Sequence, residues 1–284
     1  MTRALLSRRL LDQPIGFAAD ASEAALGTLA GVWGSVAQGH AMNETQHRPW
    51  PIPSTRWVMA QTWSDLVFMH WPIPVEVLRP LLPPSLTLDS FEGSAWLGIT
   101  PFEVSGLRAR GLPPPPQISR FPELNVRTYA TFGGKPGIWF FSLDAASAAA
   151  VAGARRTYRL PYFHADMTIT RTDGKIHYRS SRTSADEPTA ELDVRYEPTG
   201  EVQPGVPGTL EHWLTERYCL YTVDEHRRLR RAEIHHRPWP LQPAAVRIAS
   251  NTMPPSGVAL PDGLPLAHFA RRQDVVIWPP ETIA

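Results

Sequence analysis

Proline- and glycine-rich turns divide this chain into short segments, and this punctuation limits the folds open to it. Its 284 residues include 30 prolines, many in clusters such as "PWPIP", "HWPIP", "LLPPS" and "GLPPPPQ" that fall between apolar runs. Proline lacks a backbone donor and therefore marks loops and sheet edges. About ten of the intervening segments have strand patterns and about three have helical ones, without the regular strand–helix alternation of βαβ units. The sequence predicts a mainly antiparallel, barrel-like α+β domain.

The first 41 residues differ from the rest of the chain. An arginine-bearing start, "SRRLLDQ", leads into Ala/Gly-rich sequence, and no run reaches the roughly 20 apolar residues that a membrane span needs. The motif "SRRLL" is faintly like a twin-arginine signal, but acidic residues interrupt the segment that follows it. We expect residues 1–41 to be a flexible leader or an over-annotated N-terminus before a natural start at Met42. A single domain should then occupy residues 42–284, with its folded part beginning near Thr55.

The charge and cysteine content exclude several kinds of partner. The formal net charge is +1, so no global field is available to attract nucleic acid or an anionic membrane, and we expect neither as a partner. The basic run "HRRLRRAEIHHRPW" fits a solvated hairpin tip better than a nucleic-acid surface. The single cysteine, Cys219, rules out an intrachain disulfide and fits a reducing compartment, so we expect a cytoplasmic protein.

No common cofactor or nucleophile motif is present. The adjacent histidines His235 and His236 would face opposite ways on a strand and so could not both bind one metal ion. The sequence contains no "HExxH" pair, no "GxSxG" elbow and no phosphate-binding glycine loop in a strand-to-helix context. We therefore expect no metal, no nucleotide and no other cofactor.

One predicted strand carries an unusual polar row. In "FPELNVRTYA" the residues Glu123, Asn125, Arg127 and Tyr129 alternate with a mostly apolar set, and alternate side chains on a strand share a face. One interpretation is a solvated outer face. The other is that the row lines the inside of a barrel, where Glu123 and Arg127 could be catalytic and Asn125 and Tyr129 could bind a small ligand.

Further candidate site residues lie near the ends of other predicted strands. They are Tyr162 and His164 as catalytic, polarising groups, and His70, Trp71, Arg179 and Arg182 as ligand-binding groups. An arginine inside a barrel would need a carboxylate partner such as Glu123 or an anionic ligand. A helix is also predicted through "AASAAAVAGARRTY", capped by Asp144 and plugging one end of the barrel.

Several segments, in order, resemble one known family. They include "FMHWPIPVEVLRPLLPPSL", "GSAWLGITPFEV", "FPELNVRTYATFGGKPGIWFFSLDA" and "ARRTYRLPYFHADM". Over roughly residues 57 to 280 the chain resembles the uncharacterised YqjF-like family, a branch of the acetoacetate decarboxylase-like superfamily. The resemblance implies a β-barrel or cone with about three helices, and homo-oligomers are common among superfamily members.

The resemblance also implies a chemistry that this sequence lacks the residues to perform. The decarboxylases form a Schiff base through a desolvated lysine, one of a pair that follows a proline. In the similar segment here, Tyr162 and Phe163 follow Pro161, and the only lysines, Lys135 and Lys175, are in predicted turns. Glu123 is similar in position to a decarboxylase glutamate, which implies that its side chain points into the cone.

These observations leave three functions open. The first is an enzyme acting on a small carbonyl or acyl compound without an imine, with Glu123 as acid and base. The second is a barrel that binds a small, partly apolar ligand without catalysis. The third is a structural or interaction protein in which Glu123 and Arg127 form a buried ion pair.

Overall fold

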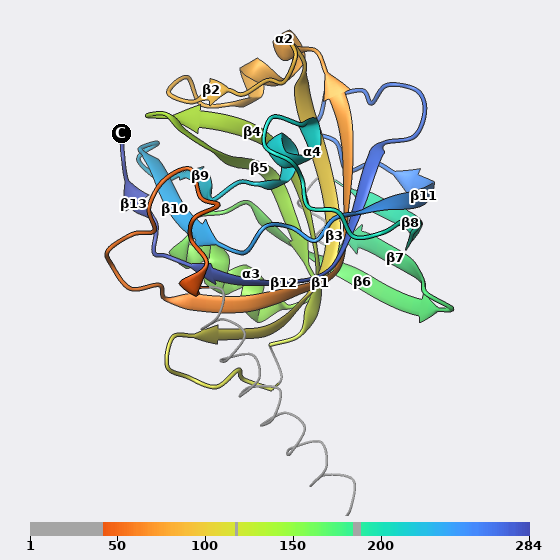
Figure 1. Ribbon diagram of the computed structural model, residues 1–284, viewed down its shortest axis with the longest axis horizontal. Helices are drawn as coiled ribbons and strands as arrows, with labels where there is room; N and C mark the ends of the chain where they lie inside the picture. Colours follow the sequence, from red (N-terminus) through yellow and green to blue (C-terminus); the bar gives the residue numbers. More distant parts are fainter. Residues whose placement is uncertain (1–41, 117–118, 184–188) are drawn as a thin grey trace, which may run out of the picture.

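The computed structural model describes residues 42–116, 119–183 and 189–284, and the predicted leader, residues 1–41, lies outside them (Figure 1). The elements follow one another as β1 (Met59–Ile73), α2 (Val75–Leu78), the 3-10 turn η1 (Arg79–Leu81), β2 (Thr87–Leu88), β3 (Ala95–Ala109), β4 (Phe121–Phe132), β5 (Lys135–Ala145), α3 (Ala148–Thr157), β6 (Tyr162–Thr172), β7 (Lys175–Arg182), β8 (Glu191–Pro198), α4 (Leu210–Thr215), β9 (Cys219–Val223), β10 (Leu229–His235), β11 (Gln242–Asn251), β12 (Leu266–Ile277) and β13 (Glu281–Thr282).

The strands of the described chain form one sheet that branches and closes on itself twice. One ring has nine strands, in the order β5-β6-β7-β8-β11-β12-β1-β3-β4, and returns to β5. The other has seven, in the order β4-β5-β9-β10-β12-β1-β3, and returns to β4. β5 pairs in parallel with β6 and with β9, whereas the remaining pairs are antiparallel. The predicted α+β barrel is confirmed, and strands β12, β1, β3, β4 and β5 form a wall that both rings share.

Side-chain alternation along the shared wall supplies a separate core to each ring. On β1, Val67 and Met69 pack into the nine-strand ring with apolar side chains of β7 and β8. Leu66 and Phe68, which alternate with them, pack into the seven-strand ring instead. Because both faces are buried, β1 contains a nearly continuous apolar run rather than the apolar–polar alternation of a half-exposed strand.

Helices close the two ends of the seven-strand ring. At one end α3 places Val151 in the apolar cluster that contains Phe121. At the other end α4 places Leu214 against Tyr129. The polar row of β4 therefore runs through the ring from its α3 end to its α4 end.

The predicted cap of α3 was wrong. The side chain of Ser147 accepts the capping hydrogen bond, from the backbone N–H of Ala150 at 3.3 Å. Asp144 is still part of β5, where its carboxylate receives two hydrogen bonds from Arg182 at 2.8 and 2.9 Å. The helix begins at Ala148, and Ser147 caps it because the N-cap residue stands directly before the first helical residue.

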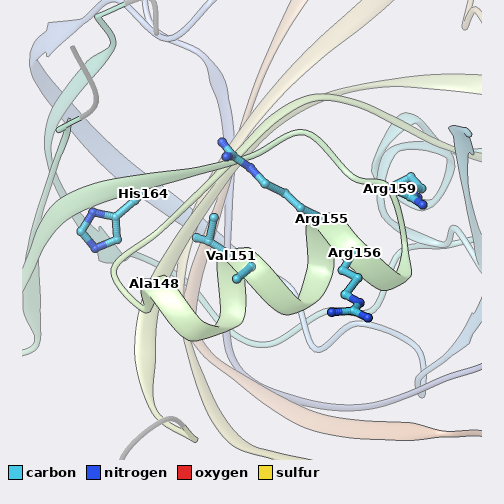
Figure 2. A pocket seen from close by; sticks show the side chains of 7 residues that line it. Ala148, Val151, Arg155, Arg156, Arg159 and His164 are labelled. Atoms are coloured by element: carbon cyan, nitrogen blue, oxygen red, sulfur yellow. The ribbon is translucent and has the colours of Figure 1, made fainter. Parts of the chain in front are cut away.

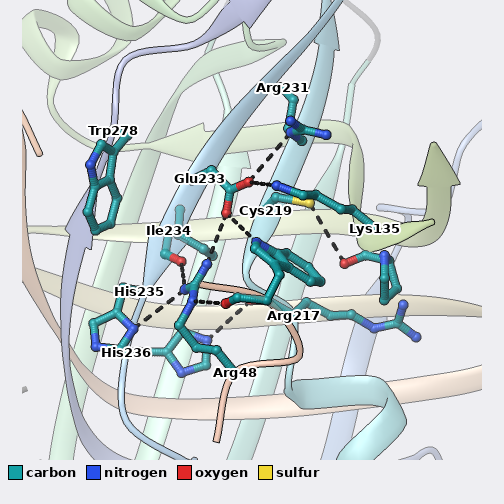
Figure 3. Close-up of polar contacts among 12 residues, drawn as sticks. Arg48, Lys135, Arg217, Cys219, Arg231, Glu233, Ile234, His235, His236 and Trp278 are labelled. Carbon is teal, nitrogen blue, oxygen red and sulfur yellow. Dashed lines mark hydrogen bonds and ion pairs between the residues drawn. The ribbon is translucent and has the colours of Figure 1, made fainter. Parts of the chain in front are cut away.

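The folded domain begins before Thr55, because residues 44–50 cross the outer side of β10. Arg48 donates to Oε2 of Glu233 at 2.9 Å and to the carbonyl of Ile234 at 2.6 Å (Figure 3). Trp50 donates its indole N–H to the same carboxylate oxygen at 2.7 Å. No local sequence pattern indicates this strap, residues 44–50, since Arg48 and Glu233 are 185 positions apart.

Strand β11 was not predicted. Its exposure alternates along the strand, but its less exposed positions include the polar Gln242 and Ser250 and the small Ala244, so its apolar pattern is weak. It is nevertheless necessary for closure, because it joins β8 to β12 in the nine-strand ring. Among the described helices, none is long and apolar enough to cross a membrane.

Candidate functional site

The polar row of β4 lies inside the seven-strand ring, so the interpretation of a solvated outer face was wrong. Glu123, Asn125, Arg127 and Tyr129 are all buried. The alternation that the sequence shows is preserved, because the intervening Leu124 packs in the core of the other ring. A buried row of this kind is not needed for an apolar core, and it places several hydrogen-bonding groups in a low-dielectric space.

Glu123 and Tyr162 meet at the α3 end of the ring. Tyr162, the first residue of β6, donates its hydroxyl to Oε1 of Glu123 at 3.0 Å. Burial raises the pKa of Glu123 to about 8, and the hydrogen bond from Tyr162 opposes this shift. Burial, followed by the charge of Glu123, raises the pKa of Tyr162 well above its usual value. At neutral pH Glu123 is therefore mainly a neutral carboxylic acid that can donate a proton.

Arg127 occupies the middle of the same row. Its guanidinium carbon lies 5.1 Å from the ring centroid of Phe68 and 5.8 Å from that of Tyr129. Its Nε is buried without a hydrogen-bond partner, and no carboxylate of the described residues lies within ion-pair distance. The expected Glu123–Arg127 pair is absent, since residues four positions apart on a strand are separated by about 13 Å.

His70 and Tyr129 form a hydrogen-bonded pair toward the α4 end. The His70 Nε2 and Tyr129 hydroxyl are 2.6 Å apart. Burial, followed by the charges of Arg127 and His268, lowers the pKa of His70 well below its usual value. His70 is therefore neutral at pH 7, and Arg127 carries the positive charge at this level of the ring.

Several other polar atoms in this region have no partner among the described residues. They are His70 Nδ1, Thr100 Oγ1, Asn125 Oδ1 and His268 Nδ1. In folded proteins most buried polar atoms form hydrogen bonds, so a local group of exceptions needs an explanation such as a ligand or water. Glu123, Asn125 and Arg127 keep exposed fractions of 7%, 6% and 6%, so water can still touch these three residues, whereas Tyr129 is fully buried.

Three candidates lie outside the seven-strand ring. Trp71 follows His70 on β1 and therefore packs in the core of the nine-strand ring. Arg179 is exposed and pairs with Asp193 at 3.3 Å. Arg182 is buried but pairs with Asp144, so the suggested partnership of either arginine with Glu123 was wrong.

His164 lines a different feature, a shallow hollow of about 450 Å³ against α3 (Figure 2). Its Nδ1 is 2.9 Å from the hydroxyl of Thr183. Arg155 and Arg156 of α3 and Arg159, which follows the helix, also line this hollow, but Figure 2 shows their side chains pointing in different directions. The hollow therefore does not present a converging set of charges, and it does not include Glu123.

Both lysines lie away from the row. Lys135 is on the outer side of β5 and β10, where its Nζ is 2.7 Å from Oε1 of Glu233 (Figure 3). Lys175 is exposed and lies 3.5 Å from Glu197. A lysine that forms a Schiff base is desolvated, whereas Lys135 is paired with Glu233 and Lys175 is exposed, so neither lysine replaces the decarboxylase lysines.

Sequence reasoning missed three residues of the site. Gly98 and Thr100 of β3 lie opposite Arg127 and Asn125, and His268 of β12 lies opposite Phe68. A Cβ added to Gly98 would lie 3.1 Å from the His70 ring and 3.2 Å from Cγ of Arg127, so glycine leaves the room that these side chains occupy. The segment "GIT" carries the alternation that could have identified the first two residues, but only the strand register identifies their partners.

Comparison with known proteins gives the family. The family model of an uncharacterised conserved protein, DUF2071, matches residues 60–274. The chain belongs to the DUF2071 family. This DUF2071 chain is also 46% identical over 229 residues to the uncharacterised protein YqjF of Bacillus subtilis, an alignment that covers 80% of this chain and 93% of YqjF. The resemblance to the YqjF-like family is therefore confirmed.

Solved structures confirm the superfamily fold of this DUF2071 chain. An acetoacetate decarboxylase from Legionella pneumophila matches with a TM-score of 0.56 at 11% identity, covering 84% of this chain and 93% of that one. The enduracididine biosynthesis enzyme MppR, in complex with pyruvate, matches with a TM-score of 0.57 at 11% identity over the same fractions. Identities this low establish the fold alone.

Proposed function

We propose that this protein is an enzyme that acts on a small carbonyl or acyl compound inside the seven-strand ring, without forming an imine. The observation that carries the proposal is the neutral carboxylic acid of Glu123, held by Tyr162 in a buried position, with a pKa raised to about 8. A carboxyl group with a pKa near the working pH can both donate and accept a proton. Buried groups with shifted pKa values of this kind are concentrated at functional sites.

The proposed step is proton transfer between Glu123 and the substrate. The carboxylic acid gives its proton to the substrate carbonyl oxygen, which leaves a carboxylate that the Tyr162 hydroxyl stabilises by its 3.0 Å hydrogen bond. The carboxylate then removes a proton from the carbon next to the carbonyl. The product is the enol, Glu123 is protonated again, and atoms and charge balance without a cofactor.

Two observations support a carbonyl compound as the substrate class. The polar atoms without partners on Thr100 and Asn125 lie on neighbouring strands beside Glu123 and can hold a polar ligand. The structurally similar MppR was solved with pyruvate, which is a carbonyl compound. The likeness to MppR is one of fold, so it supports the class of ligand and not its identity.

The test is hydrogen exchange at the α-carbon in D₂O. The wild type is incubated with a panel of ketones, oxo acids, acyl amides and lactones, and the loss of α-hydrogen signals is followed by proton NMR. The proposal expects exchange with at least one class, abolished in Glu123→Gln and slowed about 10²-fold or more in Tyr162→Phe. Exchange that survives in Glu123→Gln contradicts it.

A non-catalytic ligand-binding barrel is the second candidate. It is favoured by the aromatic lining of the ring, where Phe68 packs edge to face on Trp239 at 4.8 Å between centroids. This candidate predicts that a member of the panel raises the melting temperature of the wild type but shows no exchange and no other turnover. The matched control is His164→Gln, which changes a side chain outside the ring.

A further inference from the structure

Within the part of the chain that the structure describes, Arg127 is a buried cation without a carboxylate counter-ion. Its exposed fraction is 6%, its Nε has no hydrogen-bond partner, and no carboxylate of the described residues is within ion-pair distance. Two other buried arginines have such partners. Arg48 is 2.9 Å from Glu233, and Arg217 is 2.6 Å from Asp89.

The surroundings of Arg127 do not compensate its charge. The rings of Phe68 and Tyr129 face the guanidinium, and such contacts stabilise a cation more weakly than a carboxylate does. His70 is neutral and is held by the Tyr129 hydroxyl. A desolvated guanidinium in a low-dielectric space is costly unless an anion pairs with it.

We infer that Arg127 is the binding site for the carboxylate of the ligand, and that the ligand carries this group several carbon atoms away from its carbonyl. A guanidinium forms two parallel hydrogen bonds to a carboxylate, and Asn125 and Thr100 offer polar atoms on the way to Glu123. The placement of the carbonyl at Glu123 rests on the proposed function. The carboxylate preference at Arg127 does not depend on it.

The spacing of the row sets the length of the ligand. Arg127 and Glu123 lie four residues apart on β4, so their Cα atoms are about 13 Å apart along the strand. Pyruvate, in which the carbonyl adjoins the carboxylate, is too short to contact both groups. A linear oxo acid whose two groups are separated by a chain of methylenes can span them, since each C–C bond is about 1.5 Å long.

The test compares acids with uncharged analogues. Binding of pyruvate and of linear oxo acids with increasing separation between carbonyl and carboxylate is measured by calorimetry beside the corresponding primary amides, at pH 7. In the wild type, the long-chain acids should bind about tenfold or more tightly than their amides and more tightly than pyruvate. Arg127→Met should bind acid and amide equally, whereas Arg127→Lys should keep the preference for the acid.

Each failure has its own signature. Equal binding of acids and amides by the wild type, no binding across the series, or an acid preference that survives in Arg127→Met overturns the carboxylate site. If Arg127→Met does not fold, the wild-type comparison and Arg127→Lys still decide. An acid preference in Glu123→Gln, together with α-hydrogen exchange that persists in this variant, leaves the Arg127 site standing and overturns only the proposed reaction.

Discussion

The hydroxyl of Tyr162 and the carboxyl group of Glu123 are joined by a 3.0 Å hydrogen bond between β6 and β4, inside a ring of strands whose core is otherwise largely apolar. β6 leaves β5 at this point to enter the nine-strand ring. Tyr162 is thus supplied by the strand that branches from the shared wall. Tyr162 can reach Glu123 because β6 branches from β5 beside β4.

Glu123 makes the stability of the fold depend on pH. Its carboxyl group has a pKa of about 8 in the folded chain, raised from an ordinary value of 4.5, so between these values the folded state holds more protons than the unfolded state. Stability should therefore fall as the pH rises from about 4.5 to 8, by about 4 kcal/mol from this group. Urea unfolding of the wild type and Glu123→Gln across this range measures the difference.

The matching result for Glu123→Gln is a gain in stability at high pH. The amide has no proton to lose, so the variant should be more stable than the wild type above pH 8 and similar to it near pH 5. A loss of about 3–5 kcal/mol at every pH would instead indicate a buried ion pair at Glu123, which the structure does not contain.

His70 should destabilise the fold on the acidic side. Burial and then Arg127 and His268 lower its pKa in the folded chain, so below the unfolded pKa of about 6.5 the unfolded state binds the extra proton. Stability present above pH 6.5 should be lost as the pH falls below it. In His70→Gln the slope of urea midpoint against pH between about 5 and 7 should be shallower, and an unchanged slope would assign the effect to other groups such as His236.

Gly98 is expected to control the shape of the site. In Gly98→Ala the new methyl group would crowd the His70 ring at 3.1 Å and Cγ of Arg127 at 3.2 Å. We expect a loss of about 1–3 kcal/mol by overpacking and a weakened preference for carboxylate ligands. Gly153→Ala is the control, because no atom lies within 4 Å of its added Cβ. Unaltered ligand binding in Gly98→Ala would mean that the His70 and Arg127 side chains are not needed where they lie.

The strap should contribute through Arg48. Replacing Arg48 with Met removes its hydrogen bonds to Glu233 and Ile234, and we expect a cost of about 2–4 kcal/mol in the free energy of unfolding. Glu44→Gln is the control, because its partner Arg237 and Glu44 are both about half exposed, and exposed pairs contribute about 0–1 kcal/mol. If a denaturant titration gives the same loss of stability for Arg48→Met and Glu44→Gln, the buried charge of Arg48 does not contribute specially to the strap.

Borohydride should trap no substrate on this protein. Lys135 is paired with Glu233 on the outer side of the sheet, and Lys175 is exposed. Incubation with an oxo acid and borohydride should therefore leave the intact mass unchanged in mass spectrometry, with an acetoacetate decarboxylase as positive control. A stable adduct on Lys135 or Lys175 would return the protein to Schiff-base chemistry.

The sequence predicted the class of the fold and the common face of the β4 row, because period-two alternation is a local property. It did not predict that Trp71 and His70 serve different rings, or that Thr100 and His268 accompany the row. Those relationships depend on strand register, and on a wall whose two faces are both buried. When both faces of a strand are buried, the pattern of apolar residues cannot show which face of the strand points into which ring.

The shared wall also limits how sequences of this family can diverge. Glu123 and Leu124 face different rings, so inserting or deleting one residue in β4 would exchange the contents of the two cores beyond that point. Charged groups would enter a dry interior, and apolar groups would replace the site. Relatives should therefore differ in length at hairpin tips such as Gly133–Gly134, whereas within β12, β1, β3, β4 and β5 they should change by substitution and keep their length.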